Sequence, residues 1–536
     1  MKEMIMRILS RKFLTASSKV SGDTQVFIKK NNPFSAPIRT YSTITYPKTT
    51  HTDKHIHHNL ELLFREQYNS AAFPNINLPR YDWEVLTKNG ILLSLIPKEY
   101  GGRNSHIELC DLIEMIAKYN LPVSMYTMII TALFIRNVAK FGSKETQDEV
   151  LTDFSKKALV GGFALTEPQA GSNLAKMQTT FEKVEGGYLI QGKKHWQAFS
   201  STANWWLVAA KEKNGDGTKV YHFIIKREEG FKTLEQYEAM GLKAIDYGLN
   251  EIDALIPEHR KLNLEHGNLK DTLEMLCASR LSMAAMASGF TFRVFQESES
   301  KTKNRPIGNS TLFDLGFVKL KIKKIESNTI ITKALFLYLR NAVDFRDYLY
   351  KSYFEAQAIK VLATDKMLES ALSYQQLCGG EGYRYNSPSN IASYALLDSR
   401  VYTIFDGTND LLCQQLTEFV LKESRGKSSL KEFLESYKHT KNAFKYMNFD
   451  VSVINFVEKH ENKVLTGKII SRLFGVQCLD KMLYKQTSEF TSHKIQNSIE
   501  SLKSDIQKIM YDIQYAQNIS VEFHSEEEVR TRGPSI

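Results

Sequence analysis

The segment 402–412 reads YTIFDGTNDLL and places an acid, Asp406, directly before a glycine, Gly407. Glycine reaches backbone conformations that are closed to other residues, so an Asp-Gly pair is typical of a tight turn. Two interpretations of Asp406 are open. Its side chain either caps the helix that begins near residue 408, or its carboxylate does acid–base chemistry in a site built around the turn.

Thiol and metal chemistry find less support in the sequence. The histidines between 51 and 58 could bind a metal, but no spaced carboxylate or thiol follows them, so chance histidines in an exposed linker are favoured. The cysteines have no CxxC spacing, which is typical of free thiols in a reducing compartment. They are Cys110, Cys277, Cys378, Cys413 and Cys478. We therefore expect no metal site.

The elements that must position the turn follow the order helical, β, helical, which makes the fold class α+β. Residues 51–160 carry apolar side chains at helical spacing and are expected to form an N-terminal helical domain. Residues 161–270 contain short runs rich in β-branched and aromatic residues, which indicate a β domain. Helical spacing returns over 271–424 as a bundle. After a polar break it continues over 425–536, where an apolar stripe from Ile495 to Ile513 is expected to be packed core.

Composition and charge restrict the class of protein further. Residues 1–50 hold nine lysines and arginines against two acids, so seven of the ten excess positive charges lie in this segment. A basic, acid-poor leader is typical of a mitochondrial transit peptide, with a disordered tail on a bacterial cytoplasmic protein as the alternative. The remainder is nearly neutral, so we expect no nucleic-acid binding. The longest apolar run, 123–135, is too short to span a bilayer, so no transmembrane segment is expected.

Four motifs resemble those of the acyl-CoA dehydrogenase family, in the order found there. They are FALTEPQAGSNLAKMQTT at 163–180, GKKHWQAFSSTANWWLVA at 192–209, the arginine pair Arg280 and Arg305, and the paired segments QQLCGGEGYRYN at 375–386 and LLDSRVYTIFDGTND at 396–410. The resemblance runs from about residue 60 to 424. It implies an N-terminal helical domain, a middle β-barrel domain and a C-terminal helical bundle, with FAD as the cofactor. The extra helical region resembles that of the very-long-chain branch.

The resemblance assigns the first two segments to the flavin. Phe163, Leu165, Thr166 and Ser172 would line a flavin loop, in which backbone amides and short hydroxyls bond the flavin's pyrimidine edge; Ser172 would also contact substrate. Trp196 would pack on the isoalloxazine, or else be a core aromatic of the β domain. The family's threonine that donates to flavin N5 is replaced here by alanine, at Ala198. This departure would alter the hydrogen bonding, and with it the redox chemistry, at N5.

Further residues would complete the FAD site of a neighbouring subunit, so the resemblance implies a homodimer or homotetramer. Gln376, Gly379 and Gly380 would approach the adenine side of the cofactor. Arg305 would reach the pyrophosphate, because a guanidinium can fork two N–H bonds onto a diphosphate. The family's Phe-Gly after this arginine is absent, since RPIGNS stands here instead. An ordinary surface base is therefore the alternative for Arg305.

The resemblance also gives Asp406 a role. The acid before Gly-Thr in the family is usually the base that removes the proton α to a thioester carbonyl, with Arg280 and Gly407 near the substrate and Thr408 near FAD. That acid is normally glutamate, so Asp406 has one methylene less reach. Either the backbone advances the carboxylate, the substrate differs, or catalysis is reduced or lost. Some branches place the base just before the arginine, where Ser279 stands here, and we expect Glu274, on the same helix, to be poorly placed.

Three functions follow from these residues. The first is an FAD-dependent acyl-CoA dehydrogenase in fatty acid β-oxidation, acting on a long acyl chain, with an electron-transferring flavoprotein as acceptor. The second is a flavin oxidase for another carbon acid, because nitroalkane oxidase shares the fold and uses aspartate as its base. The third is a non-enzymatic flavin-binding assembly factor. The leader implies the mitochondrial matrix in a eukaryote and the cytoplasm in a bacterium.

Overall fold

The computed structural model describes residues 51–67, 78–171, 174–215, 217–427, 429–455, 460–484 and 489–518. The predictions for residues 1–50 and for Ser172 lie outside these ranges. Within them the predicted order of helical, β, helical and further helical elements is confirmed, and the fold is α+β. The stretch with the histidines begins a helix, α2 (His51–Glu66), where we expected an exposed linker. Among the described residues no group of histidine, cysteine and carboxylate side chains could hold a metal ion.

The N-terminal part is a set of short helices, several of which begin at a side-chain cap. After α2 come α3 (Arg80–Lys88), α4 (His106–Tyr119), α5 (Leu121–Met128), a π-helical segment (Ile129–Ile135), α6 (Arg136–Phe141) and α7 (Lys144–Lys156). Ser105, Asn120 and Ser143 cap α4, α5 and α7, each accepting a backbone N–H three residues on. By length and composition Leu121–Phe141 could cross a membrane, but 94% of its most apolar window is buried inside the protein, as in a core helix.

The middle part is a seven-stranded sheet. Its strands are β1 (Gly161–Ala164), β2 (Thr180–Val184), β3 (Gly187–Ala198), β4 (Trp205–Glu212), β5 (Tyr221–Lys226), β6 (Phe231–Tyr237) and β7 (Tyr247–Ile256). They run in the order β1-β4-β2-β3-β7-β6, with β5 paired to β4. The pairing of β3 with β7 shifts register between His195 and Gln197, so Trp196 is the extra residue of a β-bulge. Pro257 follows directly after β7, as expected for a residue that cannot extend a ladder.

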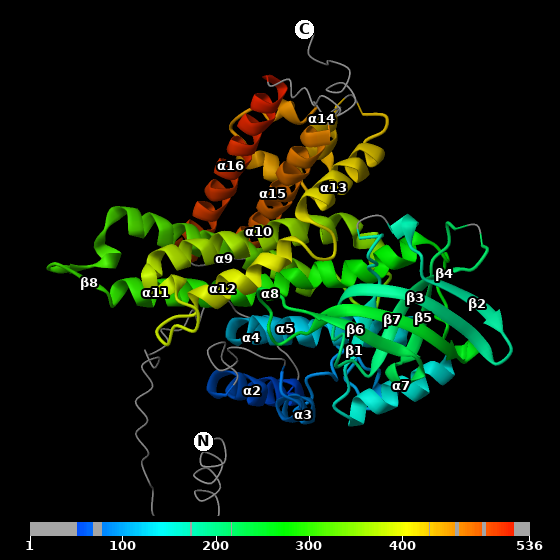
Figure 1. Cartoon of the computed structure of the whole chain (residues 1–536). Helices are drawn as coiled ribbons and strands as arrows, with labels where there is room; N and C mark the ends of the chain where they lie inside the picture. The colour runs from blue at the N-terminus through cyan, green and yellow to red at the C-terminus, as the bar shows by residue number, and fades with distance from the viewer. Residues whose placement is uncertain are drawn as a thin grey trace, which may run out of the picture. The chain divides into compact units, whose positions relative to one another are not determined.

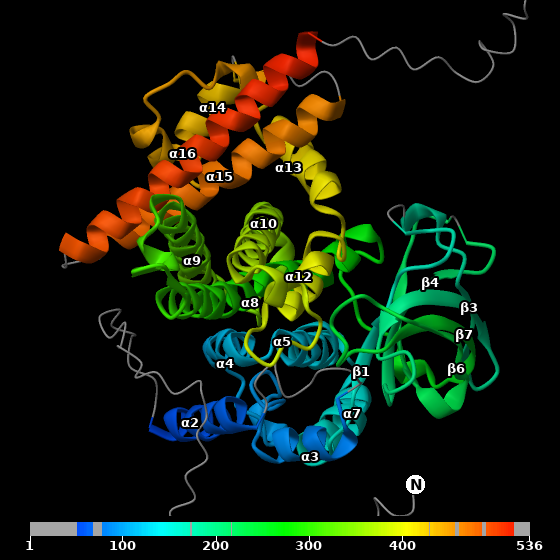
Figure 2. The ribbon, with the colours of Figure 1, turned by 60° about the vertical axis from the view of Figure 1, so that its left-hand side comes forward.

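The bundle is organised around one long helix, α8 (Leu269–Lys303), which packs against α4, α9 and α10 (Figure 2). The other members are α9 (Gly316–Ala342), α10 (Tyr353–Cys378), α11 (Gly380–Tyr383), α12 (Ala392–Arg400) and α13 (Asn409–Glu423), with a small hairpin, β8 (Pro306–Ile307) and β9 (Ser310–Thr311), after α8. Gly379 ends α10 with a φ of +63°, a conformation that favours glycine. The turn that contains Asp406 lies between α12 and α13 in the chain. It contacts α8 and α10, because side chains of both helices donate to its carbonyls.

Three further helices follow the bundle, α14 (Leu430–Ser436), α15 (His460–Tyr484) and α16 (Glu489–Asn518). In Figures 1 and 2, α15 and α16, in orange and red, lie across the bundle, and they pack against α9, α10 and α13. The apolar stripe of α16 faces inward as predicted: Ile495, Ile499, Leu502, Ile506 and Ile513 are buried, and Ile509 is partly exposed. These helices are therefore part of the packed structure and share a core with the bundle.

Candidate active site

The turn before α13 is held by its backbone carbonyls. Asp406 has a φ of +56° and Gly407 a φ of +96°, so two successive residues occupy the left-handed region. The guanidinium of Arg280, on α8, donates to the carbonyl oxygen of Asp406 from Nε (3.0 Å) and Nη2 (2.8 Å). The positive φ favours glycine at 407, and a Cβ there would also come within 2.8 Å of a terminal methyl of Leu412, which would have to shift.

The carboxylate of Asp406 contacts α8 as well. Its Oδ2 accepts a short hydrogen bond from the hydroxyl of Ser279, the residue before Arg280. Burial raises the pKa of Asp406, while the bond from Ser279 and the positive charges of Arg280 and Lys360 act in the opposite direction. The helix cap is a different residue, Thr408, whose hydroxyl accepts from the N–H of Leu411 at 3.3 Å. Asp406 therefore faces a neighbouring helix instead of capping its own.

Lys360, on α10, is a member of this cluster that sequence reasoning missed. It is fully buried, and its Nζ donates to the carbonyl of Gly407 and to Oδ1 of Asn409, both at 2.8 Å. Burial lowers the pKa of Lys360 to about 7, against the opposing charge of Asp406. The available signal was a single lysine among apolar residues in AQAIKVLA at 356–363, where a buried charge needs partners.

Arg280 and Glu274 share α8 but have different surroundings. Arg280 is buried, and among the described residues its Nη1 has no acceptor within hydrogen-bond distance. Buried unpaired donors are rare, and this one lies beside the turn. Glu274 is engaged by Arg136 at 2.5 Å and by Lys140 at 3.5 Å. Its carboxylate is occupied in a buried ion pair, which agrees with the expectation that Glu274 is poorly placed to act on a substrate.

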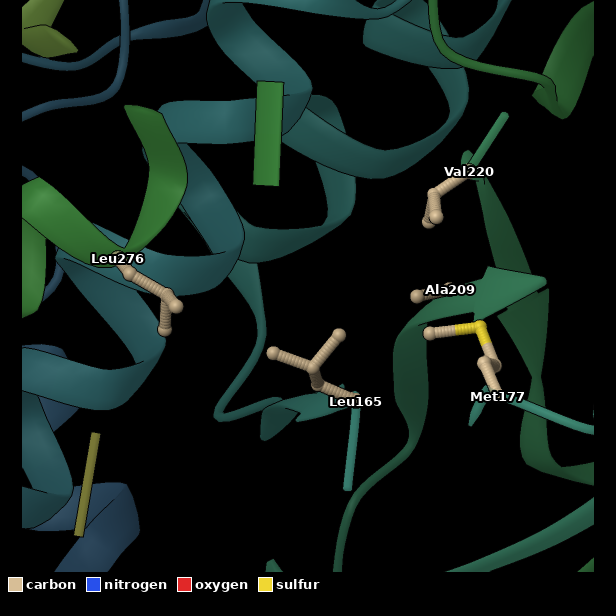
Figure 3. Packing of buried hydrophobic residues seen from close by; sticks show 5 residues of the cluster. All are labelled: Leu165, Met177, Ala209, Val220 and Leu276. Atoms are coloured by element: carbon tan, nitrogen blue, oxygen red, sulfur yellow. The ribbon is translucent and has the colours of Figure 1, made fainter. Parts of the chain in front are cut away.

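The segment predicted to be a flavin loop lies between the sheet and α8. Leu165 packs with Met177, Ala209 and Val220 of the β domain and with Leu276 of α8, one turn before Arg280 (Figure 3). Phe163 and Leu174 pack against the same cluster. Beneath the loop, Lys194 of β3 donates to Glu167 (2.8 Å) and to the carbonyl of Leu165 (3.1 Å). The apolar cluster and this buried ion pair fix the loop on both sides of the partly buried Thr166, and Leu165 beside it packs on the helix that carries Ser279 and Arg280.

Trp196 points out of the β domain. Its side chain is 53% exposed and its φ is +60°, and its ring lies 4.7 Å from that of Tyr237. The bulge therefore directs the indole outward, and Trp196 is not a core aromatic. The next residue, Gln197, is buried and donates to the carbonyl of Thr166 at 3.0 Å, which joins β3 to the loop. Ala198, partly buried, ends the strand without a hydroxyl.

The four residues predicted for a second subunit's cofactor are all exposed. Gln376, Gly379 and Gly380 surround the end of α10, and Arg305 follows α8. A Cβ built on Gly379 would lie 3.5 Å from Nη1 of Arg305, and the same nitrogen donates to the carbonyl of Leu377 at 3.5 Å. Within the described residues Arg305 forms no ion pair. The structure thus brings these residues together into one surface with an uncompensated positive charge.

The match to known proteins covers most of the described chain. Family models match in chain order: acyl-CoA dehydrogenase N-terminal domain at residues 58–157, middle domain at 162–254 and C-terminal domain at 269–421. The chain belongs to the acyl-CoA dehydrogenase family, whose members are oxidoreductases.

Individual relatives are distant. An acyl-CoA dehydrogenase from Bacillus subtilis is 24% identical over 343 residues, 62% of this chain and 88% of the relative. The very long-chain specific enzyme of Bos taurus mitochondria is also 24% identical, over 65% of this chain but only 54% of its own length. A solved acyl-CoA dehydrogenase from Bacillus anthracis, complexed with FAD, superimposes with a TM-score of 0.71 at 17% identity and covers 90% of this chain and 91% of its own. Such coverage must extend beyond residue 421, so the fold of the added helices also has a counterpart.

Proposed function

We propose that this family member removes the α and β hydrogens of an acyl thioester, giving the 2-enoyl thioester, and that Asp406 is the base. The observation that carries the proposal is the turn at Asp406. Its carbonyl is fixed by Arg280 and its carboxylate is bonded to Ser279. A general base needs a fixed position and a pKa near that of its task, and burial moves the pKa of Asp406 upward in the required direction.

The same turn supplies groups for the substrate carbonyl. Asp406 would take the proton from the carbon α to the thioester, which leaves negative charge on the carbonyl oxygen. Among the described residues the amide N–H of Asp406 donates to no protein acceptor, so it is available to bond that oxygen. The unpaired Nη1 of Arg280 adds a positive charge nearby. Donors fixed before the reaction stabilise developing charge without reorganisation, which is a large term in such catalysis.

The left-handed backbone at Asp406 offers a physical reason for aspartate in place of glutamate. Aspartate and asparagine tolerate positive φ better than longer side chains, because their short polar group can bond locally. In this turn the carboxylate bonds instead to the distant Ser279 on α8, which stands where other branches carry their base. These features favour the first of the three interpretations, in which the backbone compensates for the shorter side chain.

The residues present fit FAD as the cofactor. We assign the isoalloxazine to the surface formed by Trp196, Ala198 and Thr166, with Phe163 and Leu165 behind it, and with Ser172 and Thr408 nearby by resemblance. Arg305, Gln376, Gly379 and Gly380 of another copy suit the diphosphate and adenine, since Arg305 lacks an acidic partner among the described residues and Gly379 has a positive φ. When bound, FAD accepts the β-hydrogen as hydride. This division of the site requires a homodimer or homotetramer.

A screen of acyl-CoA thioesters for anaerobic loss of the oxidised flavin absorbance tests the function. Reduction by at least one thioester, and turnover with an artificial acceptor without peroxide, is expected. Peroxide formation with a nitroalkane or another carbon acid would favour the oxidase instead. Tight flavin that no thioester reduces would favour a non-enzymatic role.

We further propose a long acyl chain, an electron-transferring flavoprotein as acceptor and, in a eukaryote, the mitochondrial matrix. The added helices α14–α16 and the very long-chain specific relative support the long chain. The mitochondrial location in that relative's name, together with the basic leader, supports the compartment. Comparison of C4 to C20 thioesters in the same screen tests chain length, and a preference for C4 would contradict it.

A further inference from the structure

A chain of buried and partly buried polar side chains joins the added helix α15 to the turn of Asp406. Arg472 of α15 donates from Nη2 to Oδ2 of Asp365 on α10, at 2.6 Å. Oδ1 of Asp365 accepts from Nδ2 of Asn409 at 2.8 Å. Oδ1 of Asn409 accepts from Lys360, which also donates to the carbonyl of Gly407. Four contacts therefore connect a guanidinium outside the matched domains with the residue next to Asp406.

The two neighbours of Asn409, Lys360 and Asp365, determine how its side-chain amide is oriented. The carboxylate of Asp365 can only accept, so Asn409 must turn its nitrogen to Asp365, which leaves its oxygen to accept from Lys360. Thr364 Oγ1 also accepts from Nδ2 of Asn409, at 3.0 Å. Asn409 is the first residue of α13, directly after the cap Thr408, so its contacts tie the start of that helix to α10. The turn of Asp406 ends at this point.

Backbone packing holds Arg472 in place. Along α15, a Cβ at Gly467 would lie 2.1 Å from the carbonyl oxygen of Cys413 on α13, so the two helices touch at their main chains. The hydroxyl of Thr417, also on α13, donates to the carbonyl of Lys463 at 2.7 Å. The added helix thus contacts both the helix that follows the turn and, through Asp365, the helix that carries Lys360.

We propose that Arg472 is a positioning residue for Asp406, acting through Asp365, Asn409 and Lys360; the proposal rests on Asp406 being the base. Arg472 fixes the carboxylate of Asp365 through Oδ2, Asp365 orients Asn409, and Asn409 holds Lys360 on the carbonyl of Gly407. With Arg280 on the carbonyl of Asp406, the two successive peptide groups that follow the acid are then fixed. The added helices are in this way part of the catalytic apparatus as well as of the packed core.

The test compares Arg472→Gln with Arg472→Lys in the full-length, FAD-loaded protein. Glutamine removes the charge, whereas lysine keeps it at a shorter reach. A matched control is Lys494→Gln, which breaks a 2.5 Å contact between α16 and Glu326 on α9 and shares no residue with the chain of contacts. Two quantities are measured: hydrogen–deuterium exchange of the amides in 402–412, and the rate of anaerobic flavin reduction by the best thioester at saturating concentration.

Arg472→Gln is expected to speed exchange in 402–412 and to slow reduction by about 10- to 100-fold, the scale of a displacement near 1 Å. The substrate concentration for half-maximal rate should change less than threefold, and the FAD content should be unchanged. Arg472→Lys should recover most of the rate, and Lys494→Gln should behave as the parent protein in 402–412. If Arg472→Gln does not accumulate as holoprotein, Asp365→Asn combined with Arg472→Gln leaves no unpaired buried charge and is expected to show the same loss.

The proposal would be overturned if Arg472→Gln, or the combined variant, showed the same amide exchange in 402–412 and the same rate of flavin reduction as the parent protein. So would an equal loss in Lys494→Gln, since that would be a general loss of stability. Failure of the proposed function has a separate signature: Asp406→Asn would then reduce its flavin at the parental rate. An inactive Asp406→Asn beside a fully active Arg472→Gln would exclude only the positioning role.

Discussion

The hydroxyl of Ser279 donates a hydrogen bond to the carboxylate of Asp406 across 127 positions of the chain. This contact joins the middle of α8 to the turn before α13, and it relates the two places where the family is expected to carry its base. One place holds the acid, and the other holds a donor to that acid. The pair therefore forms a unit whose parts can be tested separately.

Ser279→Ala removes the donor and leaves the acid in place. A hydrogen bond to the ionised form holds a pKa down, so its loss raises the pKa of Asp406 further. A base works only when deprotonated. As the pH is lowered, the rate of flavin reduction should therefore begin to fall at a higher pH in Ser279→Ala than in the parent protein. The pH dependence of anaerobic reduction measures this. An acid limb that stays at the same pH, with the same maximal rate, would show that Ser279 does not act on Asp406.

Lys360 gives a second test in which stability is measured against pH. Its pKa is about 7 in the folded protein and near 10.5 as an ordinary side chain. Between these values the unfolded chain binds more protons, so this residue makes the free energy of unfolding rise with pH. Lys360→Gln should remove that rise, so the gain in melting temperature from pH 7 to pH 9 should be larger in the parent than in the variant. Equal gains would mean that Lys360 keeps an ordinary pKa when buried.

Much of this arrangement could be predicted from the sequence, because it depends on local signals. Helical and alternating periodicities predicted the order of the elements. The turn at Asp406 was evident from an acid before glycine. The bonds from Ser279 and Lys360 could not be predicted, because they depend on how α8 and α10 pack against the turn. Arg472 was one of many basic residues in the added region, and nothing in its local sequence indicates burial against Asp365.

Trp196 can be tested without disturbing the core, since its indole is half exposed. Trp196→Ala should weaken FAD binding by about 3- to 10-fold, the value of one aromatic stacking contact, with little change in the melting temperature of the apoprotein. Leu255→Ala is the control, because Leu255 is an equally exposed apolar residue on β7. Fluorescence titration of apoprotein with FAD measures both. Equal effects in the two variants would remove Trp196 from the proposed flavin site.

The added helices also contribute to stability through a buried ionic group. Asp505 of α16 accepts from Lys366 of α10 at 2.5 Å, and Lys324 of α9 lies 3.1 Å away. Lys366 is almost fully buried and would keep only Glu369, at 2.8 Å, as a carboxylate partner in Asp505→Ala, so the substitution should cost about 1–3 kcal/mol in the free energy of unfolding. Glu500→Ala, which removes a largely exposed acid paired with Lys503, should cost about 0–1 kcal/mol. Urea denaturation separates the two, and similar small losses would show that α16 is only loosely attached. Deletion of 425–536 should then destabilise the protein at least as much as Asp505→Ala.

The last prediction concerns the acid itself. Asp406→Asn keeps the size of the side chain, can still accept from Ser279, and removes only the negative charge. It should slow flavin reduction by the best thioester by about 10²- to 10⁴-fold or more while FAD stays bound, because proton abstraction loses its base. Asp406→Glu tests the fit of the turn. The left-handed backbone and the bond to Ser279 are matched to the shorter acid, so glutamate should crowd Ser279 and slow the reaction. Anaerobic stopped-flow absorbance measures all three proteins. A faster Asp406→Glu would mean that the site keeps the usual geometry for glutamate, and undiminished reduction by Asp406→Asn would make Asp406 a turn residue with no part in the chemistry.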